Sequence, residues 1–190
     1  WDHGGGIYGV CSDDTNGHDI LELDEIKAAV NASSQFSSSQ PLDLIGYDAC
    51  LMQILEYASG MSSYANVMVA SQETEPGDGW DYEAFLSRLQ MNPQMDAAAL
   101  GSAIVDTYYD FYNDPGQTLS TIDLTKIDDV LTAINVFNGE AETASGADWT
   151  VIHDAAGFAW NSNTWTYSGN GDDIDLGGFF SYIGNHSSNS

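Results

Sequence analysis

Basic residues are the scarcest class in this sequence. The 190 residues hold three Lys or Arg side chains against 29 Asp and Glu, which gives a formal net charge of −26 at pH 7. A surface of this sign repels phosphate backbones, so nucleic acid is excluded as a partner. Because so many acidic side chains repel one another, we expect salt, an acidic medium or calcium to offset their charge. The alternative is that the excess of acidic residues only makes the protein soluble.

Cysteine and long apolar runs are also scarce. Only Cys11 and Cys50 are present. Two cysteines have neither the spacing of a zinc cluster nor the density of a disulfide framework, so a role as a free and reactive thiol is still compatible with the sequence. No run of about 18 apolar residues occurs, which predicts no membrane span in this segment. The chain starts at Trp1 without an initiator Met or a signal-like segment, and we expect that upstream sequence is missing.

Hydrophobic residues supply enough material for a folded core. They make up 43% of the chain, and they include seven Phe, ten Tyr and five Trp. A disordered chain of high net charge lacks such residues. The length suits a single domain, so we expect residues 1–190 to form one domain, truncated at its N-terminus.

Strand and helix patterns alternate along the chain. Strands are predicted at 42–47 and 66–71, both buried, and a short strand at 119–124; helices are predicted at 21–30, 51–58, 82–89, 96–112 and 125–138. The glycine-rich residues 4–9 are expected to form a loop. The alternation predicts an α/β fold with a mainly parallel sheet covered on both faces, whose strands end at one edge, where ligands bind.

Cys50 lies between the strand predicted at 42–47 and the helix predicted from Leu51. A free thiol has a pKa of about 8.5, and a helix N-terminus beside it would favour the thiolate. The position therefore predicts a nucleophile. The alternative is that Cys50 is a small buried hydrophobic residue.

A histidine within reach of Cys50 could stabilise the thiolate and protonate a leaving amine. His3 would end a strand upstream of Trp1, beside the strand that ends before Cys50, and the loop, helix and loop between them suit a right-handed crossover. We therefore pair His3 with Cys50. Packing or surface roles are expected for the other histidines, which are His18, His153 and His186.

Gly4 follows His3 directly. Its N–H and that of Cys50 could donate to the oxygen of a tetrahedral intermediate. The alternative is that Gly4 only permits a tight turn.

Three blocks of the sequence are distinctive together. They are Trp1-Asp2-His3-Gly4-Gly5-Gly6, Tyr47-Asp48-Ala49-Cys50-Leu51-Met52 and the segment ASQETEPGDGW at 70–80. In their order and spacing they resemble the clostripain family of caspase-like cysteine peptidases. The resemblance implies a caspase-like three-layer α/β/α sandwich that lacks its N-terminal strands here. It also implies an endopeptidase that works through a thioester acyl-enzyme, with His3 and Cys50 as the catalytic dyad.

The resemblance further implies cleavage after Arg or Lys, held by acidic side chains beside the nucleophile. Asp48 and Asp78 match those positions. Asp48 would share a face with Cys50 in extended backbone, and Asp78 lies in a loop that could fold over it. Either Asp could instead serve only as a turn cap.

Calcium activation, secretion and self-cleavage in the loop after the histidine are also typical of the family. That loop, residues 7–20, contains no Lys or Arg, so self-processing there is not expected. The chemistry requires no cofactor, and calcium is expected only as an activator. An EF-hand over Ser12 to Leu23 would need Asp at the first position and Glu at the last, so the calcium ligands stay unassigned.

Two other functions remain open. The first is a catalytically inert caspase-like module that binds basic peptides or calcium, although an intact His3 and Cys50 argue against it. The second is another thiol hydrolase, such as an amidase or transpeptidase, because acyl transfer to water or to an amine shares its first step.

Overall fold

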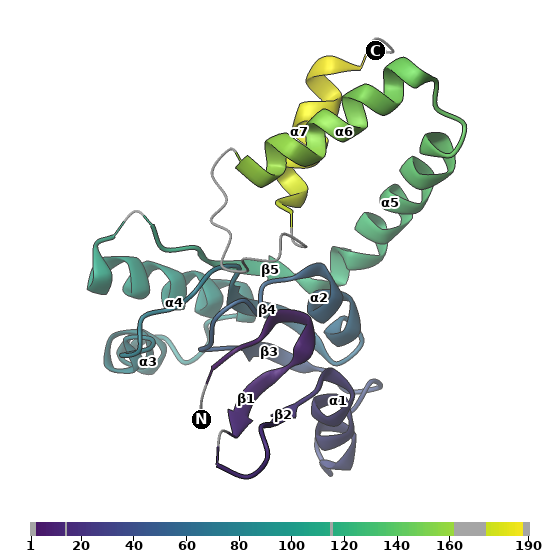
Figure 1. Cartoon of the computed structure of the whole chain (residues 1–190). Coiled ribbons are helices and arrows are strands. Elements are labelled where there is room, and N and C mark those ends of the chain that lie inside the picture. The colour runs from purple at the N-terminus through teal and green to yellow at the C-terminus, as the bar shows by residue number, and fades with distance from the viewer. Residues whose placement is uncertain (1–2, 14, 115, 162–173, 188–190) are drawn as a thin grey trace. The chain divides into compact units, whose positions relative to one another are not determined.

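The computed structural model describes residues 3–13, 15–114, 116–161 and 174–187. Contacts divide the chain into two compact units, residues 1–128 and 129–190 (Figure 1). The expectation of one domain over 1–190 stays a prediction. Within the described ranges, no helix combines the length and apolarity needed to cross a membrane.

A three-stranded mixed sheet forms the centre of the first unit. Its strands are β3 (Leu42–Gly46), β4 (Ala65–Ser71) and β5 (Leu119–Asp123), in the order β3-β4-β5. All three predicted strands are confirmed. β3 runs parallel to β4, but β5 runs antiparallel to it, so the sheet is mixed rather than mainly parallel. The cause is the pair of helices that follows β4. These helices bring the chain back to the C-terminal end of β4, so β5 starts opposite Ser71 and runs in the reverse direction.

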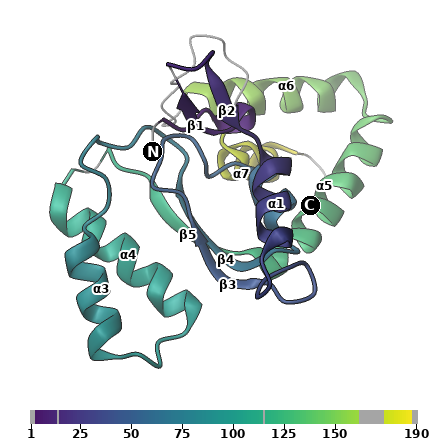
Figure 2. The ribbon, with the colours of Figure 1, turned by 90° about the horizontal axis from the view of Figure 1, so that it is seen from below.

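Helices cover both faces of this sheet (Figure 2). α3 (Tyr82–Met91) and α4 (Ala97–Tyr112) lie on one face, while α1 (Leu23–Ala32) lies on the other and packs on α2 (Leu55–Met61). This is the predicted α/β fold with helices on either side of a sheet. Because both faces are covered, β4 is buried along almost its whole length, which explains why its sequence is a continuous apolar run.

The core under α3 and α4 joins the sheet to the loop that follows β4. Its buried members are Val69, Trp80, Phe85, Ile104, Tyr108 and Leu119. α4 starts where the sequence predicts, because Asp96 Oδ1 accepts a hydrogen bond of 2.8 Å from the Ala99 N–H. The predicted helix start at residue 96 is therefore confirmed.

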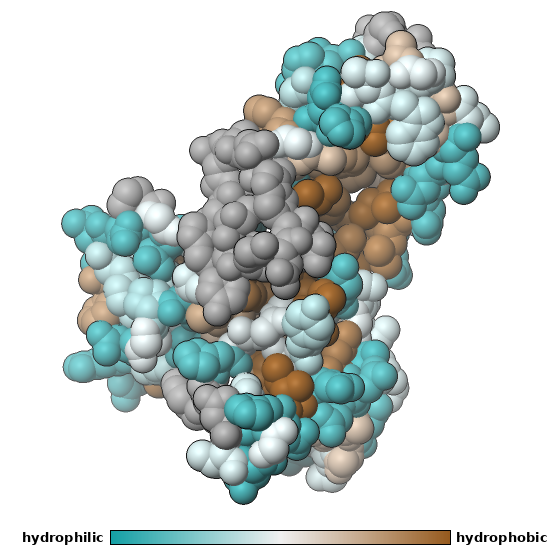
Figure 3. All heavy atoms as spheres, viewed as in Figure 1, coloured by the Kyte–Doolittle hydropathy of each residue, from teal (hydrophilic) through white to brown (hydrophobic). Residues whose placement is uncertain are grey.

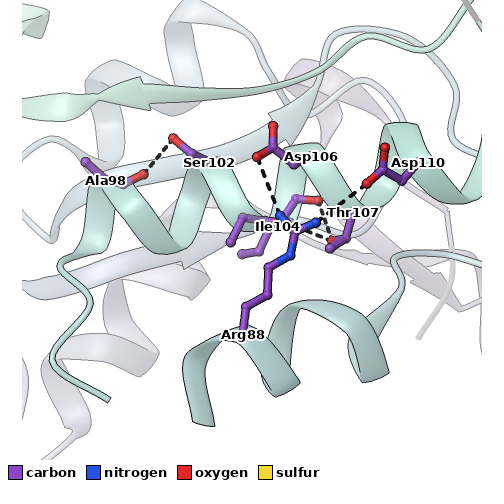
Figure 4. A network of polar contacts seen from close by, with 8 residues as sticks. Arg88, Ala98, Ser102, Ile104, Asp106, Thr107 and Asp110 are labelled. Atoms are coloured by element: carbon purple, nitrogen blue, oxygen red, sulfur yellow. Dashed lines mark hydrogen bonds and ion pairs between the residues drawn. The ribbon is translucent and has the colours of Figure 1, made fainter. Parts of the chain in front are cut away.

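Arg88 connects α3 to α4 (Figure 4). Its two terminal nitrogens each lie 3.5 Å from a carboxylate oxygen on α4, one of Asp106 and one of Asp110. All three side chains are substantially exposed, so the pairing contributes at most about 1 kcal/mol and weakens with salt.

The N-terminal segment forms a small antiparallel structure where a loop was predicted. A 3-10 turn, η1 (Gly6–Tyr8), is followed by the hairpin of β1 (Val10–Asp13) and β2 (Asp19–Leu21). Gly4 pairs with Val10. Two flanking bonds hold this pair, from Gly5 N–H to Gly9 O at 2.8 Å and from Cys11 N–H to His3 O at 2.9 Å. The residues around His3 are therefore fixed to β1.

The second unit is helical. The first unit ends with a short 3-10 turn, η2 (Leu124–Lys126), and the first residues of α5 (Ile127–Ala141); the rest of α5, α6 (Gly146–Asn161) and α7 (Leu176–His186) belong to the second unit. The helix predicted at 125–138 is confirmed as α5. α6 and α7 pack through Ala155, Ala159 and Phe179. Hydrophobic side chains gather between α5 and α7 (Figure 3) and line an apolar groove there.

Candidate functional site

Cys50 lies in a turn beyond the end of β3, not at the start of a helix. α2 begins at Leu55, so the predicted helix N-terminus beside the thiol is wrong. The apolar spacing after Cys50 reflects a buried turn, in which Met52 is completely covered. Leu51 has a φ of 65°, a left-handed conformation that a large side chain rarely adopts and that is often found at functional sites.

The loop that follows β4 wraps around this turn. Backbone bonds run from Leu51 N–H to Glu73 O at 3.0 Å and from Gln53 N–H to Ser71 O at 2.9 Å. The Glu75 N–H donates to Cys50 Sγ at 3.2 Å. Cys50 is half-buried. Its sulfur therefore receives a backbone N–H from the loop after β4 instead of the helix N-terminus that was expected.

Gly4 packs directly on the backbone of Cys50. A Cβ added at Gly4 would lie 1.9 Å from the Cys50 carbonyl oxygen, so only glycine fits there. In the Gly4–Val10 pair the hydrogen bonds belong to the flanking residues, which leaves the Gly4 N–H pointing away from β1. The exposed His3 is the adjacent residue, so the block containing His3 contacts the block containing Cys50.

The other three histidines lie in parts of the chain other than the segment that packs on the Cys50 turn. His18 is exposed between β1 and β2, with a φ of 59°. His153 is exposed on α6 beside Asp154. His186 stacks on Tyr182, whose carbonyl oxygen lies 2.8 Å from His186 Nδ1. Each of these positions agrees with a surface or packing role.

Asp48 is held tightly beside Cys50. Its Oδ2 accepts hydrogen bonds from the Trp80 N–H at 3.2 Å and from the Tyr82 hydroxyl at 3.0 Å. Gly79 has a φ of 69°, and a Cβ there would lie 2.7 Å from the same Oδ2. The Tyr112 hydroxyl donates to Gly79 O at 2.7 Å, so α4 fixes the loop against Asp48.

Asp78 lies in a different environment, exposed in the turn closed by the Gly79 N–H bond to Pro76 O at 3.0 Å. Burial raises the pKa of the Tyr112 hydroxyl, and the negative charge of Asp78 adds to the effect. The two predicted substrate-binding acids therefore differ in burial. Asp48, after β3, is half-buried, whereas Asp78 is exposed in the loop that follows β4.

Glu75 was missed by the sequence reasoning. Its Oε2 accepts a bond of 3.1 Å from Trp80 Nε1, while its buried Oε1 has no hydrogen-bond partner. Burial raises the pKa of Glu75 to about 9, and the adjacent Asp48 carboxyl group adds to the effect. The only available indication was its place in the block at 70–80, because no periodicity marks a loop carboxyl as buried.

No metal site is evident in the part of the chain that the structure describes, where no three His, Cys, Asp or Glu side chains are grouped to hold an ion. Asp13 accepts hydrogen bonds from both the backbone and the side chains of Thr15 and Asn16. These bonds, that of the Asn16 side chain above all, lower the pKa of Asp13 to about 2. The loop is closed by its own side chains, and calcium activation stays a prediction.

Comparison with known proteins gives a family match over nearly the whole chain. The sequence model described as the clostripain family matches residues 1–184. No curated protein is significantly similar in sequence.

Several solved structures share the fold. A secreted cysteine protease from Bacteroides thetaiotaomicron, bound to an irreversible peptide inhibitor, has a TM-score of 0.61 and 18% identity over 96% of this chain and 50% of its own. An inactive protease zymogen from Parabacteroides distasonis has a TM-score of 0.58 and 17% identity over 95% of this chain and 47% of its own. A B. fragilis cysteine protease has a TM-score of 0.57 and 16% identity over 93% and 70%. This chain thus spans about half the length of the first two.

Proposed function

Because the chain belongs to the clostripain family, we propose that it is the core of a cysteine endopeptidase that cleaves after Arg or Lys, with Cys50 as nucleophile and His3 as acid and base. One observation carries the proposal: Gly4 packs on the Cys50 backbone so closely that a Cβ would lie 1.9 Å from its carbonyl oxygen. That contact brings His3 to the turn that presents the thiol.

In the proposed reaction Cys50 Sγ attacks the scissile carbonyl carbon after His3 has taken the thiol proton. The N–H groups of Gly4 and Cys50 donate to the oxyanion of the tetrahedral intermediate. His3 returns the proton to the leaving amine, and a thioester remains on Cys50. Water, deprotonated by His3, then hydrolyses the thioester and restores the thiol.

The preference for a basic residue before the scissile bond would come from Asp48 and Asp78. Asp48 keeps its carboxylate beside Cys50 by accepting bonds from Trp80 and Tyr82. A guanidinium or ammonium group would supply the positive partner that a half-buried carboxylate needs. Asp78, exposed at the loop tip, would close over the entering side chain.

An extracellular location and activation by calcium belong to the same proposal. Two of the solved structures most similar in fold are described as secreted. The formal charge of −26 would attract calcium and basic polypeptide substrates alike.

Hydrolysis of matched fluorogenic peptides that end in Arg, Lys, Asp or Leu tests the proposal, using full-length protein with and without calcium. Cleavage confined to the Arg and Lys peptides supports it. Transfer of the acyl group to an added amine in preference to water would favour another thiol hydrolase. A folded, calcium-loaded protein that cleaves none of the peptides but binds the basic ones would be the inert module.

Replacing Asp78 by Ala is expected to lower kcat/KM for the Arg peptide by about fivefold, because an exposed ion pair contributes up to about 1 kcal/mol. Cleavage of a peptide with a neutral residue at the same position should change less, since the attack itself does not use Asp78. Asp128→Ala, at another exposed site, is the control for the loss of one negative charge. An unchanged preference between Arg and neutral peptides in Asp78→Ala removes Asp78 from the pocket.

A further inference from the structure

Two carboxyl groups, those of Asp48 and Glu75, lie within hydrogen-bonding reach of each other near Cys50. Each of the three Lys and Arg residues of the chain acts elsewhere. Lys27 pairs with Asp24 at 2.9 Å, Arg88 bridges two carboxylates of α4, and the charge of Lys126 acts on Asp123. Asp48 and Glu75 therefore share their site without a lysine or arginine from the chain itself.

The hydrogen bonds around this pair leave one buried oxygen, Glu75 Oε1, without a partner. Asp48 Oδ2 already has two donors and Glu75 Oε2 has one, from Trp80. No donor reaches Glu75 Oε1, although the Asp48 carboxyl group lies within hydrogen-bonding reach of Glu75. A proton on Glu75 supplies the missing bond, because two carboxylates cannot donate to each other whereas an acid can donate to a carboxylate.

We propose that Glu75 is a positioning residue that stays protonated and donates a hydrogen bond to Asp48, so that the pocket beside Cys50 carries one negative charge instead of two. The inference rests on the proposed function, in which Asp48 receives the basic side chain of the substrate. The side chain of Glu75 touches neither substrate nor reacting atoms; it acts through Asp48.

This arrangement serves substrate binding. With three donors, from Trp80, Tyr82 and Glu75, the Asp48 carboxylate is fixed in orientation. A second negative charge in direct contact with Asp48 would repel it, and the proton on Glu75 removes that charge. The same residue also reaches the nucleophile through its backbone, since the Glu75 N–H donates to Cys50 Sγ.

The titratable groups that face Glu75 determine how its protonation affects stability at different pH. It faces Asp48 and Cys50 in the turn after β3, Tyr82 at the start of α3, and Tyr108 and Tyr112 on α4. Burial raises the pKa of Glu75 from 4.5 to about 9, so the folded protein holds a proton that the unfolded chain has lost between these values. The associated stability is present in full below about pH 4.5 and is lost as pH rises toward 9.

Kinetics of two variants at pH 7 test the role. Glu75→Gln keeps a donor for Asp48 and an acceptor for Trp80, so kcat/KM for an Arg peptide should stay within about threefold of the parent. Glu75→Leu removes the donor and should lower kcat/KM at least about tenfold, mainly through KM, because a hydrogen bond to a charged group is lost. If Gln is as damaging as Leu, the ionised carboxylate is required and the proposal is overturned.

Thermal unfolding of the parent and Glu75→Gln between pH 5 and pH 9 gives a readout that does not depend on activity. The Tm of the parent should fall relative to that of the variant as pH rises, because only the parent loses the proton. Parallel curves would show that Glu75 holds no proton and would overturn the inference. If the parent shows the relative fall in Tm but cleaves no Arg or Lys peptide, the protonation of Glu75 is supported and the proposed peptidase function is not. Failure of the inference and failure of the proposed function are therefore distinguishable.

Discussion

Replacing Cys50 by Ala is expected to abolish peptide hydrolysis, with a loss of roughly 10⁴-fold or more in kcat, the range seen when a hydrolase loses its nucleophile. The loss follows from the chemistry, since Ala has no atom that can form the thioester. The fold should survive, because the variant gives up the hydrogen bond from Glu75 to the sulfur, which contributes about 1 kcal/mol. Steady-state rates on the Arg peptide and thermal unfolding of the same sample measure both effects.

The second cysteine of the chain provides the matched control. Cys11 is exposed on β1, and Cys11→Ala should hydrolyse the Arg peptide at the parental rate. A thiol-directed inhibitor with a peptide that ends in Arg should label the parent and Cys11→Ala but not Cys50→Ala. Persistent cleavage by a folded Cys50→Ala would remove the thiol from the mechanism.

The order of the elements could be predicted because it depends on local patterns. Strands β3, β4 and β5 each carry apolar or β-branched residues, most continuously in β4. The start of α4 is set by a cap, Asp96, that acts over a few residues. The direction of β5 could not be predicted in this way, because it depends on two helices that return the chain to the edge where β4 ends. The hairpin of β1 and β2 was missed because its strands are only four and three residues long, which leaves too little alternation to recognise.

Some features of the candidate site could be predicted from the sequence and others could not. Strand order was enough to suggest that His3 and Cys50 meet at one edge. The spacing after Cys50 indicated a helix because apolar residues in a buried turn repeat at similar intervals, and no pattern reveals the φ of 65° at Leu51. Glu75 was beyond reach, because its burial depends on Trp80 and on α4, which lie in other parts of the fold.

The contact between Gly4 and Cys50 leads to the second large expected effect. Gly4→Ala would place a Cβ 1.9 Å from the Cys50 carbonyl oxygen, and both sides of that contact are backbone. The segment around His3 must therefore move away from the turn. A misplacement of about 1 Å can cost about 10²-fold in rate, so kcat/KM for the Arg peptide should fall by at least that factor. Forcing an extra methyl group into a packed site also costs about 1–3 kcal/mol of stability.

A second glycine distinguishes the site from the general effect of a methyl group. Gly139 lies in α5, with nothing within 4 Å of an added Cβ, and Gly139→Ala should be neutral or slightly stabilising because Ala favours helix. Comparing the two variants by thermal unfolding and by cleavage of the Arg peptide tests the proposal. The contact accounts for the activity if Gly4→Ala stays folded and loses cleavage while Gly139→Ala retains it. A folded Gly4→Ala with the parental rate would mean that the His3 segment need not pack on Cys50 for catalysis, and the pairing of His3 with Cys50 would lose its structural basis.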